Sequence, residues 1–260
     1  KAVIIGATAT FVGAALVPAS SLALGANYGA RNNAKPATAA SEAGPFCNKL
    51  STDASNLTSK MTDLESKVTQ AWAQQDQKLA SDGQNVDSRV ATDRQKADTE
   101  RQTDFTKLEA KATTGAQKQA VQDYETAVNN AVSTRRAAYD AARATFRDGV
   151  KSAVDSRRGT VSGQQNGFSD AVNSAISTAQ ASCSSDSNGG PAARTAFVAS
   201  LKTARQTFVS DRKDDSKIGQ QVSQLAATRN AAFKAADQAF QTSMQSAHQA
   251  LQQAFGKKSI

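Results

Sequence analysis

The chain has little of the residue types on which most catalytic centres and metal sites depend. Its 260 residues include one His, two Cys, one Trp and four Pro, and aromatic residues make up 5%. So few His and Cys residues argue against a His-based catalytic centre and against a Cys/His zinc site. We therefore expect a protein that is not an enzyme, with no catalytic residue, no metal, no cofactor and no small-molecule substrate.

The chain is also short of hydrophobic residues. They make up 39% of the sequence, and the mean hydropathy is −0.50. This fraction is below that of typical globular domains, although 260 residues could enclose a sizeable core. Long helices rich in Ala and Gln need only a narrow apolar seam, and this composition is sufficient for them.

An uncharged, apolar run occupies residues 2–26 and follows Lys1. A basic residue, an apolar run and then small residues are typical of a secretory signal, here with cleavage near Gly25 or Ala26. The run is also long enough to cross a bilayer as a helix. We expect residues 1–26 to be an export signal or a retained membrane or filament-core helix. Residues 27–45, with Gly and Pro among small polar residues, are expected to form a flexible linker.

If it is retained, the apolar segment resembles the N-terminal helix of type IV pilins, in which Pro18 would introduce a kink. The resemblance covers residues 2–26 only. Ile5 stands where bacterial pilins usually have Glu. The resemblance implies a filament subunit that keeps this helix.

The body of the chain, residues 46–260, has the pattern of long α-helices. Pro191 is its single proline, and no alternating stretch predicts a strand. Apolar residues recur in heptads, as at Leu50, Leu57 and Leu64. We predict an all-α fold of long antiparallel helices that form an elongated, coiled-coil-like bundle. The three glycines in residues 159–167 are expected to interrupt a helix.

The two cysteines are equally far from Gly115, since 68 residues separate it from Cys47 and 68 from Cys183. A hairpin that turns at Gly115 would bring both to the same end, where they could form a disulfide in an oxidising compartment. A third segment of similar length follows Pro191. The preferred arrangement is a rod of three arms, at about 46–114, 116–183 and 191–256, each on the order of 100 Å long. The alternative splits the third arm at residues 214–219 into a hairpin, which gives four or more shorter helices.

The net charge of +8 is unevenly distributed. Residues 46–116 hold 10 basic and 11 acidic residues, whereas residues 191–260 hold 10 basic and 4 acidic ones. A basic face attracts polyanions. The candidate contacts for an anionic polymer are Arg135, Arg136, Arg157, Arg158, Lys257 and Lys258.

Together these features predict an exported, non-enzymatic structural or adhesive protein of a bacterial envelope or the extracellular space. Its expected partners are copies of itself, in a homo-oligomer or filament, or other envelope components. A first alternative is a pilin-like filament subunit, anchored in the membrane if residues 2–26 are retained. A second alternative is a polyanion-binding module that uses the basic later arms.

Overall fold

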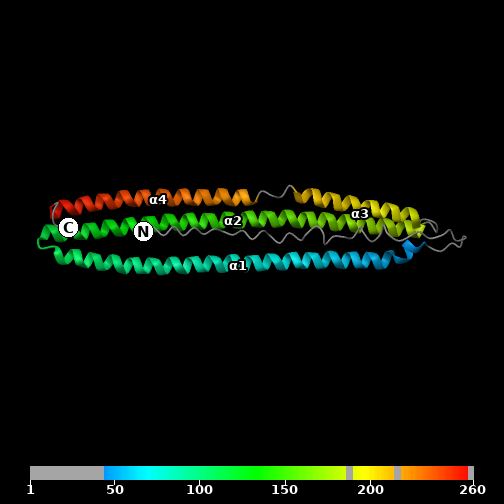
Figure 1. Ribbon diagram of the computed structural model, residues 1–260, viewed down its shortest axis with the longest axis horizontal. Helices are drawn as coiled ribbons and strands as arrows, with labels where there is room; N and C mark the ends of the chain where they lie inside the picture. The colour runs from blue at the N-terminus through cyan, green and yellow to red at the C-terminus, as the bar shows by residue number, and fades with distance from the viewer. Residues whose placement is uncertain (1–43, 186–189, 214–217, 257–260) are drawn as a thin grey trace. The chain divides into compact units, whose positions relative to one another are not determined.

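The computed structural model describes residues 44–185, 190–213 and 218–256. These ranges contain four α-helices and no strand, which confirms the predicted all-α fold. The helices are α1 (Pro45–Lys111), α2 (Gly115–Ser185), α3 (Gly190–Lys213) and α4 (Ile218–Phe255) (Figure 1). The expected export signal and most of the expected linker lie outside the described residues.

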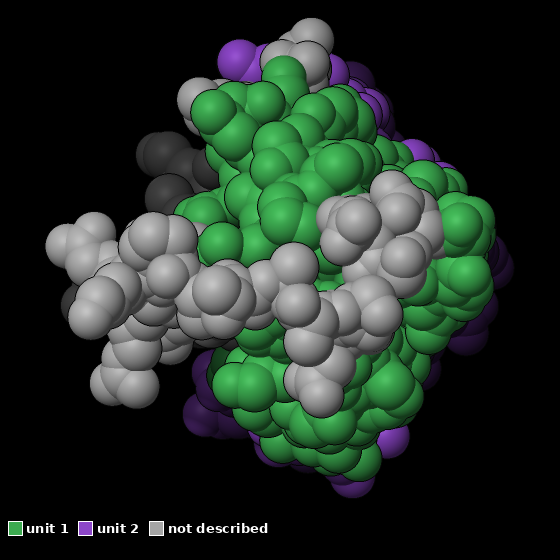
Figure 2. All heavy atoms as spheres, turned by 90° about the vertical axis from the view of Figure 1, so that its right-hand side faces the viewer, with its two compact units in different colours: residues 1–79, 159–215 green, residues 80–158, 216–260 purple. Residues whose placement is uncertain are grey.

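The chain forms two compact units, which are coloured separately in Figure 2. Unit 1 comprises residues 1–79 and 159–215, and unit 2 comprises residues 80–158 and 216–260. Helices α1 and α2 each contribute one part to either unit, whereas α3 belongs to unit 1 and α4 to unit 2. Each unit is therefore built from three helical segments.

The core of unit 1 is a narrow seam of aliphatic and small side chains. From α1 it takes Leu50 and Leu57, which repeat the predicted heptad, and α3 contributes Phe197, which is 2% exposed. The remaining members are the buried residues Ala54, Val172, Ala175, Ile176 and Ala179. Four of the eight core residues are alanine or valine, so the three helices can approach closely.

The core of unit 2 lies next to the connection between α1 and α2. Its largest members are Phe105 of α1, Tyr124 of α2 and Leu251 of α4, and the rings of Phe105 and Tyr124 meet edge to face at 6.1 Å. Such a contact adds to the free energy of apolar burial. Ala112, Val121, Val128 and Ala247 complete this cluster.

The expected first and second arms are each a single helix, but the expected third arm is described as two helices, α3 and α4. The four residues between them, 214–217, lie outside the described residues. The sequence from Asp211 to Lys217 is almost entirely charged, so this stretch offers no apolar side chain to a core. Helix α3 packs into the core of unit 1 and α4 into that of unit 2, so neither core contains an α3–α4 hairpin.

The prediction that residues 159–167 interrupt a helix is wrong, because α2 continues through them. Glycine lowers helix stability but does not end a helix whose apolar seam continues on both sides. Here Val154 and Val172, before and after the glycines, are both buried. The seam is less regular in α1, where Leu79 is out of phase with Leu50, Leu57 and Leu64 and is 43% exposed.

Two glycines of α2 differ in what a methyl group would meet. An ideal Cβ on Gly149 would lie 2.6 Å from Cδ2 of Leu225 in α4, whereas one on Gly163 would meet no atom within 4 Å. We expect Gly163→Ala to raise the free energy of unfolding by about 0.5–1 kcal/mol, because alanine favours the helix. Gly149→Ala should be less stable than Gly163→Ala by about 1 kcal/mol, since Leu225 must leave its rotamer. Urea unfolding of the two variants measures the difference, and equal midpoints would contradict the close α2–α4 contact.

Candidate functional site

The cysteines predicted to pair are brought together in unit 1. Their Sγ atoms lie 1.96 Å apart and their Cα atoms 5.7 Å apart, which confirms the pairing of Cys47 with Cys183. The chain is tightly packed beside them, because an ideal Cβ on Gly190 would lie 3.3 Å from the Cα of Gly44. The first turn of α1, the last turns of α2 and the start of α3 are thereby joined.

In unit 2, three ion pairs connect α1 to α2, and we call them the charge ladder. In each pair both terminal nitrogens of an Arg donate to both oxygens of an Asp, the fork-to-fork arrangement in which such pairs are strongest. The pairs are Asp87 with Arg147, Arg94 with Asp140, and Asp98 with Arg136. Along α1 the ladder advances by seven and then four residues, from Asp87 to Arg94 to Asp98. Their partners on α2 go back by the same steps, from Arg147 to Asp140 to Arg136. Two antiparallel helices in constant register require this match.

The ladder lowers the pKa of each of its carboxyl groups. Hydrogen bonds from Arg136 and then from Arg101 lower the pKa of Asp98 to about 2. The hydrogen bond from Arg147 lowers the pKa of Asp87, and that from Arg94 lowers the pKa of Asp140. The Asp side chains remain between 42% and 54% exposed. Exposed ion pairs contribute little to stability, so their main effect is to select one register.

A second set of paired side chains connects α2 to α4 in unit 2. The ring of Tyr139 stacks on that of Phe233 at a centroid distance of 4.1 Å, and Nε of Arg135 donates to Asp237 at 2.7 Å. The hydroxyl of Tyr139 also donates to Asp237, at 2.8 Å. Burial and this contact raise the pKa of the Tyr139 hydroxyl. Tyr124 of α2 and His248 of α4 continue the series, with the Tyr124 hydroxyl 3.2 Å from Nε2 of His248.

Arginines cover the aromatic rings at this contact, and we call the set the arginine–aromatic column. Arg135 lies 5.0 Å from the ring centre of Phe240 and 5.3 Å from that of Tyr139, and Arg229 lies 4.6 Å from that of Phe146. Arg143 and Arg229 each lie 5.8 Å from the ring centre of Phe233. The column thus consists of Arg135, Tyr139, Arg143, Phe146, Arg229, Phe233 and Phe240.

The six residues predicted to contact a polyanion are therefore not equivalent. Arg135 is paired with Asp237, and Arg136 is paired with Asp98, so carboxylates of unit 2 already neutralise both. Arg157 and Arg158 are half-buried in α2, and each already interacts within the chain. Lys257 and Lys258 lie outside the described residues.

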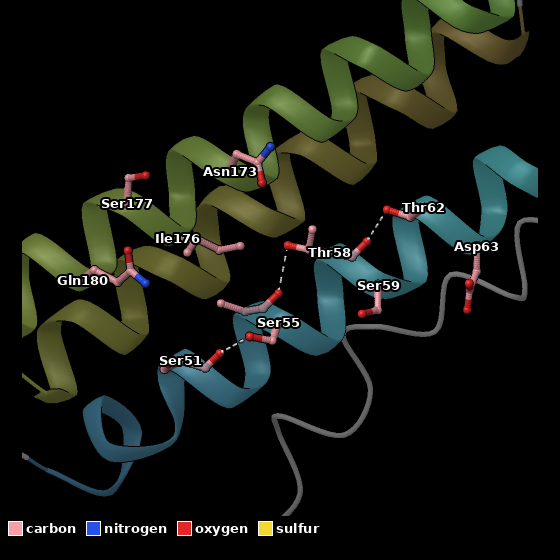
Figure 3. Close-up of a pocket in the computed structure, with 11 residues that line it drawn as sticks. Ser51, Ser55, Thr58, Ser59, Thr62, Asp63, Asn173, Ile176, Ser177 and Gln180 are labelled. Atoms are coloured by element: carbon pink, nitrogen blue, oxygen red, sulfur yellow. Dashed lines mark hydrogen bonds between the residues drawn. The ribbon is translucent and has the colours of Figure 1, made fainter.

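An open groove lies between α1 and α2 in unit 1, with a volume of about 750 Å³ (Figure 3). Along α1 its hydroxyl groups donate to carbonyl oxygens one turn back, as Ser55 does to Ser51 and Thr58 to Ala54. Along α2 it presents Asn173, Ser177 and Gln180. Its lining is mostly hydroxyl and amide side chains, with Asp63 as the charged member and Ala54 and Ile176 as the apolar ones.

A second open groove, of about 790 Å³, lies between α2 and α4 in unit 2. Eight of its 17 lining residues are alanines, from both helices, and Arg135 and Phe240 of the column also line it. In neither groove do titratable groups converge as they do in a catalytic pocket.

Two further observations apply to the described ranges alone. They contain no group of three or more His, Cys, Asp or Glu residues arranged to hold a metal ion. None of the four helices in them combines the length and the apolar character needed to cross a membrane.

Sequence reasoning found the disulfide but missed the ladder and the column. Arg136 was predicted to contact an anionic polymer, and its pairing with Asp98 was not anticipated. A signal was available, because opposite charges occur at matching steps on either side of the predicted turn at Gly115. The column carries no such local signal, since Arg143 and Arg229 are far apart in the sequence.

The disulfide is expected to provide a large share of the stability. It closes a loop of 136 residues, for which the chain-entropy model gives about 4–5 kcal/mol. The double variant Cys47→Ala/Cys183→Ala should lose about this free energy of unfolding in urea titrations. A reductant should lower the midpoint of the native protein and leave that of the double variant unchanged. Equal midpoints for the two oxidised proteins would contradict the expectation.

Acid should weaken unit 2 through Asp98. Its pKa of about 2 in the folded chain is below the value of about 3.9 for an unfolded Asp. The unfolded state thus binds the proton more readily, so the stabilisation is present above about pH 4 and is lost as the pH falls towards 2. The difference in unfolding free energy between the native protein and Asp98→Asn should shrink over this range. In a background carrying Arg101→Gln and Arg136→Gln, that pH dependence should vanish, and its persistence would refute the assignment.

Comparisons of the chain with protein-family models, with curated proteins and with solved structures found no match. Its function therefore has to be argued from the contacts described above.

Proposed function

We propose that this chain is an exported, non-enzymatic structural or adhesive protein of a bacterial envelope or the extracellular space. Its helices would form an elongated bundle whose outer faces contact copies of itself or other envelope components. The observation that carries the proposal is the pairing of Cys47 with Cys183. Disulfides persist mainly in oxidising compartments outside the cytosol. The uncharged segment at residues 2–26 supports export independently.

The use of polar side chains supports a structural role. Catalytic centres converge their titratable groups on a pocket that can enclose a substrate. In unit 2, by contrast, the Arg, Asp and Tyr side chains of the ladder and the column pair between helices. The two grooves are open and lined by small side chains, which suits contact with another extended chain.

The thiol state of the native protein tests this proposal. We expect the protein to be recovered from the cell surface or the medium, with no alkylation of Cys47 or Cys183 until a reductant is added. Mass spectrometry before and after reduction measures both thiols, and the double variant Cys47→Ala/Cys183→Ala is the matched control. Recovery from the cytosol with both thiols free would overturn the proposal.

The intact mass of the same sample distinguishes export with cleavage from the filament alternative. Cleavage near Gly25 or Ala26 is expected, and it would remove the apolar segment. A mass that retains residues 2–26, together with filaments that sediment, would favour the pilin-like subunit in its place.

A further inference from the structure

Positive charge exceeds negative charge at one position of the arginine–aromatic column. Both oxygens of Asp140 accept hydrogen bonds from Arg94, at 2.7 and 2.9 Å, so Arg143 is only a more distant neighbour of that carboxylate, at 3.6 Å. Arg229 donates through Nε and Nη2 to the neutral amide oxygen of Asn230. Within the described part of the chain, no carboxylate pairs with Arg229. Among the described residues, Arg143 thus shares its carboxylate with Arg94, and Arg229 on the facing helix pairs with none.

The aromatic rings hold these two guanidinium groups in place. Arg143 and Arg229 share the ring of Phe233, at 5.8 Å each, and Arg229 also covers Phe146. A cation–π contact restricts where a guanidinium can lie and leaves N–H groups able to donate hydrogen bonds. Such preorganisation reduces the entropy that is lost when an anion binds.

The surroundings of Arg143 favour an additional negative charge. Burial lowers the pKa of this guanidinium most; Asp140 raises it, Arg94 and Arg147 lower it, and Asp87 raises it. The guanidinium groups of Arg94, Arg143 and Arg147 outnumber the carboxylates of Asp87 and Asp140, so an anion placed beside Arg143 would be attracted. The side chain of Arg143 is 25% exposed, so a ligand can reach it from solvent.

We propose that Arg143 and Arg229 form a binding site for the sulfate or phosphate groups of a linear anionic polysaccharide. The planar fork of Arg matches such oxyanions, and neighbouring groups along the polymer would contact the two residues in turn. A single-stranded nucleic acid fits the site less well, because its binding relies on free aromatic faces for stacking bases. The faces of Tyr139 and Phe233 are stacked on each other, with 6° between their planes.

This site differs from the one that the sequence suggested. Arg135 and Arg136 are neutralised by Asp237 and Asp98, whereas Arg143 and Arg229 are not neutralised in this way. The inference adds a class of partner to the proposed adhesive function, and rests on that function only for its biological meaning. Its test uses the purified full chain. The binding inference can therefore fail while the disulfide and the export remain correct, and it can hold while the proposed export is wrong.

The test is binding of the full chain to heparin, a sulfated polysaccharide, at several NaCl concentrations. We expect the affinity to fall as salt rises, and Arg143→Gln/Arg229→Gln to weaken binding about tenfold at low salt. The double variant should also reduce the slope of log affinity against log salt by about 2, since two contacts are lost. The matched control is Lys234→Gln, which removes an exposed cation of α4 outside the column and should change the affinity less than about twofold.

Two further arms distinguish this site from general attraction to the basic chain. The variant Arg143→Lys/Arg229→Lys keeps both charges but loses the fork, and it should still bind more weakly than the native protein. Single-stranded DNA should bind more weakly than heparin. Circular dichroism and thermal unfolding identify any variant that loses its fold, and the Lys variant then supplies the comparison. No binding of heparin by the native protein, or equal losses for the double variant and Lys234→Gln, would overturn the proposal.

Discussion

The register between long antiparallel helices is the constraint on which this structure depends. Helices that bury mostly alanine and valine present nearly the same seam after every heptad, so sliding by seven residues costs little apolar contact. In unit 2 the charge ladder makes such a slip unfavourable. A slip by one heptad would bring Asp87 opposite Asp140 in one direction and Arg94 opposite Arg147 in the other. Either slip would break the three fork-to-fork pairs and set one pair of like charges against each other, which favours the observed register.

Unit 1 meets the same constraint with covalent and aromatic contacts. The pairing of Cys47 with Cys183 fixes the start of α1 against the end of α2, and the rings of Phe168 and Phe208 set α2 against α3 at 5.3 Å. Half of the core residues of unit 1 are alanine or valine, which pack closely without specifying a position. The disulfide therefore fixes both the ends of the two helices and the alignment of the seam between them.

The sequence predicts the helices better than it predicts what joins them. Heptads such as Leu50 and Leu57 and the absence of proline indicate long helices, and the symmetry about Gly115 indicates the turn and the cysteine pair. The prediction that the glycines of residues 159–167 interrupt a helix is wrong because the effect of an isolated glycine on helix stability depends on the packing around it. Hydrophobic periodicity does not report that packing. The column could not be predicted, since the contact of Arg143 and Arg229 with one ring depends on the register of α4 against α2.

The two ways of fixing register respond to different conditions. A reductant acts on the disulfide of unit 1 and leaves ion pairs intact, whereas acid and salt act on the ladder of unit 2 and leave a disulfide intact. An anionic polymer bound at Arg143 would also respond to acid and salt, since it would compete with Asp140 for the same guanidinium. Because Arg94 already binds both oxygens of Asp140, that competition would leave the ladder in place. The column can therefore acquire a ligand while the register of α1 against α2 is kept.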